Sequence, residues 1–264
     1  MTSARTPPEI VARLRAAGCV FAEEEAEVLL RSAGTPAELD RLVAARVAGR
    51  PLEHLVGWVG FAGREIAVGP GVFVPRRRTE LLVDQVVALR PRVVVELCCG
   101  AAAVAAAVAA ALPEAEVHAA DVSPEALVHA RRNLRADRVH GGDMDEGLPA
   151  DLRGRVDVLV ANAPYVPTAA ISSMPPEARD HEPLAALDGG ADGLVHHRRI
   201  GALAPRWLRP GGHLVIETSA EQAAGTAAAM VGFATAVVED PERYATAVVG
   251  ILTDAGSRPP RSST

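Results

Sequence analysis

The chain has 264 residues, of which 49% are hydrophobic and 23% charged, and its formal net charge is −6. A chain of this length and composition can bury a full core and form one large domain with a small appendage. The acidic balance argues against a duplex nucleic acid as partner, because that kind of affinity comes largely from neutralising phosphates.

The three cysteines are odd in number and include the adjacent pair Cys98 and Cys99. Adjacent cysteines suit neither a disulfide framework nor the spaced pairs of a metal site, so we expect a reducing compartment and no bound metal. The first residues lack an apolar leader, and the longest apolar stretch, 101–112, is shorter than a bilayer span of roughly 20 residues. These features predict a cytoplasmic protein without a membrane segment.

The N-terminal part of the chain changes character near residue 50. Residues 1–50 carry apolar positions at helical spacing between breaks such as Gly18 and Gly49, which predicts a small helical domain. Residues 51–75 carry short runs of Val, Phe, Trp and Ile between glycines, a pattern typical of a β-hairpin linker. A helix is expected near 79–89.

From residue 76 to 253, apolar strands alternate with helical segments. This alternation predicts an α/β domain with a mostly parallel, Rossmann-like sheet covered on both faces. The expected strands cover 93–97, 116–121, 156–160 and 213–217, with another before Gly141 and an antiparallel edge pair over 234–238 and 245–252. The tail, 254–264, is rich in Ser, Pro and Arg and is expected to be disordered.

The carboxyl ends of the first two strands of this domain are candidate ligand-binding positions, because doubly wound sheets bind ligands there. Asp121 follows Gly100 at the spacing where an acidic side chain meets a ribose hydroxyl in nucleotide-binding folds. The alternative is that Asp121 only caps the next helix, a role that Ser123 can fill alone. Asp143 is a candidate partner for an adenine amino group, or else a solvated turn residue.

The segment Asn162-Ala163-Pro164-Tyr165 directly follows an apolar strand. The Asn162 side-chain oxygen and the Ala163 carbonyl can accept both hydrogens of an amide or amino group and so aim its nitrogen at a methyl donor. Tyr165 can stack on a flat acceptor group. The alternative is an ordinary turn, in which Asn and Pro are common.

Several motifs, taken in order, resemble those of the HemK/PrmC family of protein-glutamine methyltransferases. They are the turn at 162–165, Arg50-Pro51-Leu52-Glu53-His54-Leu55-Val56-Gly57, Val72-Phe73-Val74-Pro75-Arg76, Thr79-Glu80, His181-Glu182-Pro183 through Asp192-Gly193-Leu194, and Leu208-Arg209-Pro210-Gly211-Gly212-His213-Leu214. The resemblance covers about residues 50–250. It implies a class I methyltransferase that uses S-adenosylmethionine, forms S-adenosylhomocysteine, and methylates a glutamine of a protein such as a peptide-chain release factor.

The resemblance also implies roles for individual residues. Those implied to surround the cofactor are Glu96, Cys98, Gly100, Asp121, Val122, Asp143 and Asn162. Those implied to act on the acceptor glutamine are Asn162, Ala163, Pro164 and Tyr165, with Phe73, Pro75, Arg76 and Glu182 lining its pocket. The N-terminal helical piece is implied to grip the protein substrate.

The chain departs from the family pattern at several positions. Cys98 and Ala102 stand where the family prefers glycine, Ala163 replaces a proline, and Arg77 and Arg78 replace Pro and Glu. Two further hypotheses therefore stay open: a non-catalytic binding module on a methyltransferase scaffold, and an amino methyltransferase acting on a small molecule or a base. A nicotinamide dehydrogenase is supported only by the poor glycine loop.

Overall fold

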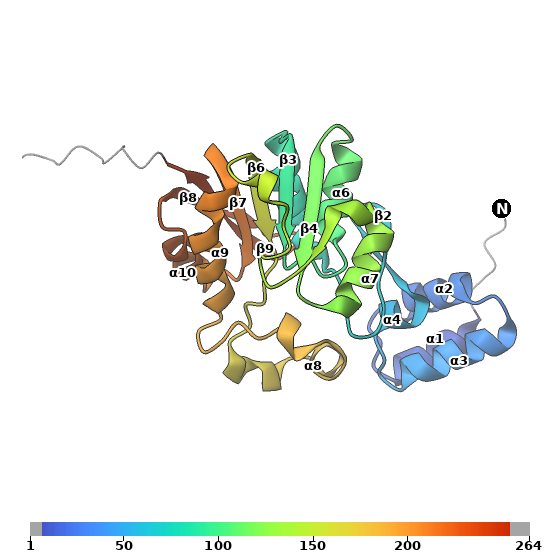
Figure 1. Cartoon of the computed structure of the whole chain (residues 1–264). Helices are drawn as coiled ribbons and strands as arrows, with labels where there is room; N and C mark the ends of the chain where they lie inside the picture. The colour runs from blue at the N-terminus through green and yellow to red at the C-terminus, as the bar shows by residue number, and fades with distance from the viewer. Residues whose placement is uncertain (1–6, 254–264) are drawn as a thin grey trace, which may run out of the picture.

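The computed structural model describes residues 7–253, so the tail predicted to be disordered, 254–264, lies outside the described residues (Figure 1). The helices are α1 Pro8–Ala16, α2 Ala22–Ser32, α3 Pro36–Val47, α4 Leu52–Val56, α5 Glu80–Ala88, α6 Ala103–Ala111, α7 Pro124–Asn133, α8 Pro176–His181, α9 Val195–Trp207 and α10 Ala223–Ala229. The strands are β1 Trp58–Phe61, β2 Arg64–Ala67, β3 Val93–Leu97, β4 Glu116–Asp121, β5 Val139–Gly141, β6 Val156–Ala161, β7 Leu208–Thr218, β8 Phe233–Asp240 and β9 Ala245–Leu252.

Helices α1 to α3 form a helical unit that lies to one side of the sheet, next to α4 (Figure 1). The Thr35 hydroxyl accepts a hydrogen bond from the Glu38 amide (3.2 Å) and caps α3, whose first residue is a proline. These helices share an apolar cluster of their own, formed by Ile10, Leu14, Cys19, Ala22, Ala26, Leu29 and Val43. These helices thus have an apolar core distinct from that of the sheet.

The segment predicted as a hairpin linker contains a helix as well as the hairpin. Its first residues form α4, which ends at Gly57 in the left-handed region (φ 84°) and packs Leu52 and Val56 on the N-terminal cluster. Strands β1 and β2 follow, joined by Ala62 and Gly63, both at positive φ, as a two-residue hairpin turn requires. The helix was missed because a five-residue helix is too short to show a period.

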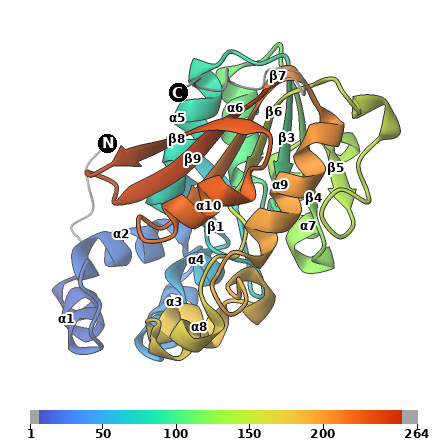
Figure 2. The same cartoon turned by 90° about the vertical axis from the view of Figure 1, so that its left-hand side faces the viewer.

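The predicted α/β fold is confirmed. The main sheet has seven strands in the order β5-β4-β3-β6-β7-β9-β8, parallel from β5 to β7, with β9 antiparallel to both β7 and β8. Helices α5, α6 and α7 pack with one apolar cluster, and α9 and α10 with the cluster of the other face (Figures 1 and 2). This three-layer arrangement brings the carboxyl ends of β3, β4 and β6 together at one edge.

Most strand bounds match the sequence prediction, and the main difference is β7, which begins at Leu208 rather than His213. Its pairing with β6 is irregular between Val156 and Val158, and Gly211 within it has φ 70°. An irregularity of this kind keeps Pro210-Gly211-Gly212 within the strand, which sequence patterns cannot anticipate. Among residues 7–253, no helix is both long and apolar enough to cross a membrane.

Candidate active site

A cavity of about 410 Å³ lies at the carboxyl ends of β3, β4 and β6. Its walls come from the loop after β3, the turn after β6, the segment between the hairpin and α5, and the segment around α8. All the site residues predicted from the sequence line this one cavity, namely Phe73, Pro75, Arg76, Glu96, Cys98, Gly100, Asp121, Val122, Asp143, Asn162, Ala163, Pro164, Tyr165 and Glu182. The fold thus brings them together, and their individual roles remain predictions.

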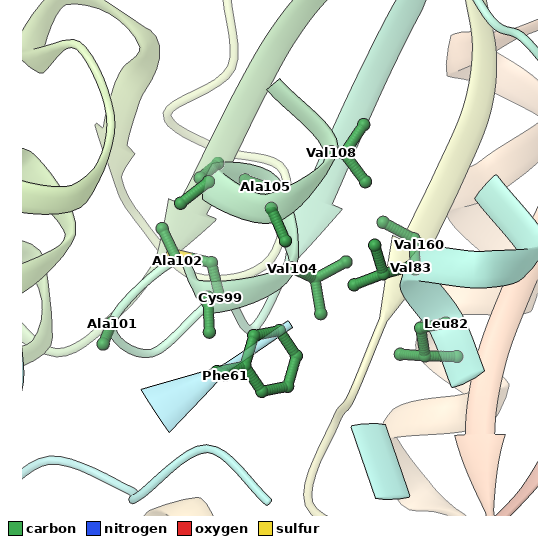
Figure 3. Packing of buried hydrophobic residues seen from close by; sticks show 14 of the residues in the cluster. Phe61, Leu82, Val83, Cys99, Ala101, Ala102, Val104, Ala105, Val108 and Val160 are labelled. Atoms are coloured by element: carbon green, nitrogen blue, oxygen red, sulfur yellow. The ribbon is translucent and has the colours of Figure 1, made fainter. Parts of the chain in front are cut away.

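The loop after β3 has a backbone conformation that favours glycine at three positions, although only one of them is a glycine. Cys98, Gly100 and Ala102 all lie in the left-handed region, with φ of 52°, 54° and 58°. A residue with a Cβ is strained there by roughly 1–2 kcal/mol. Ala102 and Cys99 face an apolar cluster that also contains Phe61 of the hairpin, and packing around the loop offsets part of that strain (Figure 3).

Glu96 is buried under this loop at the carboxyl end of β3. Its Oε2 accepts a hydrogen bond from the Ala105 amide (2.7 Å) in the first turn of α6. Burial raises the pKa of Glu96, the Ala105 hydrogen bond lowers it and the nearby Asp121 charge raises it, and together these effects bring it to about 8. The carboxyl group therefore gains a proton readily unless a cation lies beside it.

Asp121, at the carboxyl end of β4, is hydrogen-bonded to the loop that follows β3. Its Oδ2 accepts a hydrogen bond from the Gly100 amide (2.8 Å), and its Oδ1 accepts one from the Ser123 amide (2.9 Å). The helix α7 is capped by Ser123, whose hydroxyl accepts from the Ala126 amide (3.1 Å). Ser123 therefore caps α7, and the Asp121 side chain lies on the cavity wall.

The cavity suits a ligand that carries positive charge and an apolar part. Glu96 and Asp121 both line it, and neither has an ion-pair partner among the described residues. Val122 beside them is 63% exposed and offers an apolar surface. The volume of about 410 Å³ lies within the range of small-molecule and cofactor sites.

Asp143 lies on the loop after β5, where its Oδ2 forms an ion pair with Arg199 of α9 (2.8 Å). The neighbouring Met144 lies 4.0 Å from the Cys98 sulfur, measured between the two sulfur atoms. The predicted adenine partner is therefore on the cavity wall, and a carboxylate oxygen paired with arginine keeps lone pairs for a second donor.

The turn after β6 presents two acceptor oxygens. The Asn162 Nδ2 donates to the Thr79 hydroxyl (3.1 Å), so the Asn162 Oδ1 faces away from Thr79. Within residues 7–253, neither this Oδ1 nor the Ala163 carbonyl accepts a hydrogen bond. Both oxygens are therefore available to the two hydrogens of an amide group.

Tyr165 is fixed at both ends. Its hydroxyl donates to Glu217 Oε1 (3.1 Å), and its carbonyl accepts from the Gln222 side chain (2.9 Å). Arg78 donates to the same Glu217 oxygen (3.2 Å). Burial raises the pKa of both the Tyr165 phenol and the Glu217 carboxyl.

The segment after α8 is hydrogen-bonded to the segment that contains Phe73 and Arg76. Glu182 Oε1 accepts hydrogen bonds from the Val74 amide (3.1 Å) and from Arg76 (2.6 Å), whose guanidinium lies 5.3 Å from the centre of the Phe73 ring. Burial raises the pKa of Glu182. Its Oε2 is buried without a partner among the described residues.

Helix α8 also contacts the N-terminal helices through an ion pair. Arg46 of α3 forms an ion pair with Glu177 of α8 (3.3 Å) and a two-bond pair with Glu25 of α2 (2.6 and 3.1 Å). The arginine side chain is only 10% exposed. Glu177 lines the cavity, so the Arg46 side chain connects the N-terminal helices to the cavity wall.

Sequence reasoning assigned no role to Thr79 and Arg78, which line the cavity, or to Glu217, which accepts hydrogen bonds from Tyr165 and Arg78. Glu217 is 1% exposed at the carboxyl end of β7, and Thr79 is 3% exposed at the start of α5. A signal existed for Glu217, because an acidic residue near the carboxyl end of a buried strand is unusual in a core. No local pattern could have shown that it meets Arg78 and Tyr165.

Similarity to known proteins identifies a family of methyltransferases. The profile of the Methyltransferase small domain family matches residues 64–175. A release factor glutamine methyltransferase from Moorella thermoacetica is 39% identical over 249 residues, which cover 84% of this chain and 87% of the relative. The chain belongs to the HemK/PrmC family of protein-glutamine methyltransferases.

Other relatives of the HemK/PrmC family match a shorter part of the chain. A release factor glutamine methyltransferase from Mycolicibacterium smegmatis is 44% identical over 187 residues, 69% of this chain and 66% of the relative. The chain thus spans a little less than two thirds of several curated relatives, with 65% covered in the Streptomyces coelicolor enzyme. A methyltransferase structure from Pyrococcus furiosus (18% identity, TM-score 0.55, covering 73% of this chain and 90% of that one) shares the class I methyltransferase fold.

Proposed function

We propose that the protein transfers a methyl group from S-adenosylmethionine to the side-chain amide nitrogen of a glutamine in a peptide-chain release factor. The observation that carries this proposal is the pair of free acceptor oxygens, Asn162 Oδ1 and the Ala163 carbonyl, on the wall of the cavity that Glu96 and Asp121 also line. The names of the family's relatives, release factor glutamine methyltransferases, support the choice of acceptor.

The chemistry required of the acceptor site is orientation. An amide nitrogen is a weak nucleophile because its lone pair is delocalised into the carbonyl. Asn162 Oδ1 and the Ala163 carbonyl accept its two hydrogens, which turns the nitrogen lone pair toward the cofactor side of the cavity. The Tyr165 ring, fixed through its hydroxyl, provides a flat surface for the amide plane.

The cofactor side of the cavity provides negative charge and apolar surface. S-adenosylmethionine supplies an electrophilic methyl group on a positively charged sulfur. Glu96 and Asp121 would lie nearest its charged part and its ribose, and Asp143 would accept from its adenine amino group. Val122 and Met144 would cover the flat face of the base.

The first test is calorimetric titration of the purified protein with S-adenosylmethionine and S-adenosylhomocysteine. Micromolar binding, about −8 kcal/mol, would support the enzyme. A folded protein that binds neither ligand would contradict it and favour the non-catalytic scaffold, the hypothesis that the altered glycine loop raises.

The second test is mass spectrometry of release factors after incubation with enzyme and cofactor. We expect a gain of one methyl group on a glutamine, and no gain on a release factor whose acceptor glutamine is replaced by asparagine. Asn162→Ala should lower the turnover number at least about a hundredfold, as loss of an orienting hydrogen bond does in other enzymes. Turnover of Asn162→Ala at the parental rate would contradict the clamp, and methylation of small amines alone would favour a small-molecule enzyme.

A further inference from the structure

Beyond the two acceptor oxygens, the structure contains two buried polar side chains, Glu217 and Thr79, to which the proposed reaction assigns no role. Glu217 is 1% exposed at the end of β7, and its Oε1 accepts hydrogen bonds from two side chains, Tyr165 (3.1 Å) and Arg78 (3.2 Å). Thr79 is itself 3% exposed and accepts from Asn162 Nδ2 (3.1 Å). These hydrogen bonds therefore join β7, the start of α5 and the turn after β6.

We propose that Glu217 and Thr79 are positioning residues for the acceptor glutamine: Thr79 holds the Asn162 amide with its oxygen available to the acceptor, and Glu217 holds the Tyr165 ring. This inference rests on the proposed function for its kinetic consequence. Neither Glu217 nor Thr79 needs to touch the acceptor, because each acts through a residue of the turn.

The hydrogen bonds explain how each side chain is held. The Asn162 Nδ2 donates to the buried Thr79 hydroxyl, which leaves the Asn162 Oδ1 free to accept from the acceptor glutamine. A flipped Asn162 would offer the acceptor glutamine a donor instead of an acceptor. Glu217 Oε1 accepts from the Tyr165 hydroxyl and so holds the ring of the same turn.

Arg78 supplies the counter-charge that keeps the buried carboxylate in its accepting form. Its side chain is 42% exposed and reaches Glu217 from the cavity side. The neighbouring Arg77 is exposed, does not line the cavity and has no ion pair among residues 7–253. The two adjacent arginines, both departures from the family pattern, thus have different surroundings.

The kinetic experiment compares Thr79→Val, which keeps the branched shape but loses the hydroxyl, with Thr79→Ser, which keeps the hydroxyl. We expect Thr79→Val to lower kcat at least about tenfold, with KM for a glutamine peptide and affinity for S-adenosylhomocysteine within about threefold. Thr79→Ser should restore most of kcat. Arg78→Met should lower kcat as well, whereas Arg77→Met should leave it unchanged.

A second readout does not depend on catalysis. The chain has only two asparagines, Asn133 and Asn162, and two glutamines, so few side-chain amide signals appear in a nitrogen–proton NMR spectrum. The Asn162 pair is assigned by its loss in Asn162→Asp. In the parent and in Thr79→Ser, one of its two protons should exchange slowly with solvent, and in Thr79→Val both should exchange fast while the Asn133 pair is unchanged.

The outcomes separate the two proposals. If the parent protein methylates no glutamine, the proposed function fails, but a slowly exchanging Asn162 proton that depends on the Thr79 hydroxyl still supports the positioning inference. If the Asn162 protons exchange fast in the parent, or if Thr79→Val keeps kcat within about twofold of the parent, the positioning inference is overturned even in an active enzyme.

Discussion

At the scale of single residues, the loop after β3 adopts a backbone that favours glycine at several positions, although it contains one glycine. Cys98 has φ 52° and lines the cavity, so its Cβ is strained where a glycine would not be. We expect Cys98→Gly to be more stable than Cys98→Ala by about 1 kcal/mol, because only the glycine relieves the left-handed backbone. Urea unfolding of the two variants measures the difference.

The alanine variant is the control that separates backbone strain from the sulfur contact. Both variants lose the 4.0 Å contact with the Met144 sulfur, and only one loses the Cβ. We also expect Cys98→Gly to bind S-adenosylhomocysteine at least as tightly as the parent. Equal stability of the two variants would mean that the loop adopts another backbone conformation.

Glu96 predicts a pH dependence of stability. Its pKa is about 8 in the folded protein because of burial, against an ordinary value near 4.5. Between these values the folded chain retains a proton that the unfolded chain has lost, so the free energy of unfolding falls as pH rises, by at most about 1.4 kcal/mol per pH unit. Well above pH 8 the Glu96 carboxyl is ionised in both the folded and the unfolded chain, so it no longer changes the free energy of unfolding as pH rises.

The measurement is denaturant unfolding from pH 5 to 9 for the parent and for Glu96→Gln. Glutamine keeps an acceptor for the Ala105 amide and does not titrate, so the difference in stability between the two proteins should shift in favour of Glu96→Gln as pH rises from 5 to 8. A difference that does not change with pH would show that Glu96 ionises normally.

The same scale shows what sequence can say about a site. Asp121 and Asn162 were predictable because each directly follows or ends a buried strand, and the topology of a parallel sheet fixes where those ends lie. The contacts of Thr79 and Glu217 were not, because each side chain bonds to an element far away in the chain: Thr79 to Asn162, and Glu217 to Tyr165. Local patterns carry no information about which side chain meets which across a fold.

At the scale of elements, strands β3, β4 and β9 were predicted at their observed bounds, since each is an apolar run between clear breaks. The missed features are short or irregular: α4, the extended start of β7, and the helical turns around α8. A short element is decided by tertiary contacts, which outweigh local propensity. The segment around α8 illustrates this, because it forms ion pairs with two residues from other parts of the chain, Arg46 and Arg76.

Gly201 gives a prediction opposite to helix propensity. Alanine in the middle of a helix is normally better than glycine by about 1 kcal/mol. A Cβ at Gly201 in α9 would lie 2.1 Å from the carbonyl oxygen of Ala229 at the end of α10, so α9 and α10 would have to separate. We expect Gly201→Ala to lower the free energy of unfolding by about 1–3 kcal/mol, as urea unfolding can measure.

The matched control is Gly60→Ala in β1. A Cβ at Gly60 meets nothing within 4 Å and its φ is not positive. Its effect should stay within about 0.5 kcal/mol of the parent. A neutral or stabilising Gly201→Ala would mean that α10 moves away without loss, and that the close approach of the two helices contributes little.

At the scale of the whole molecule, the N-terminal helices and the sheet have separate apolar cores joined by few contacts. Besides α4, the connections include Arg46 with Glu177 (3.3 Å) and Arg31 with Glu65 (3.3 Å), with Arg31 also over the Trp58 ring. Polar connections of this kind are weak relative to a buried core. The two parts should therefore lose structure independently.

Leu29→Ala tests this independence. Leu29 is fully buried in the N-terminal cluster, and removing its side chain should destabilise that cluster by about 2–5 kcal/mol. Hydrogen exchange should then show lost amide protection in α1 to α3 and unchanged protection in β3 and β6. S-adenosylhomocysteine affinity and methylation of a short glutamine peptide should stay near parental values, while methylation of an intact release factor should fall, because the helices are expected to grip the protein substrate.

The comparison variant is Leu159→Ala in β6, equally buried but in the sheet core. It should reduce protection in the sheet and weaken ligand binding, the reverse of the Leu29→Ala pattern. If Leu29→Ala instead removes protection throughout the sheet, the two cores fold as one unit, and the Arg46 and α4 contacts couple them more strongly than their polar character suggests. If peptide and protein methylation fall together, the N-terminal helices act on the cavity itself, through α8, rather than on the protein substrate.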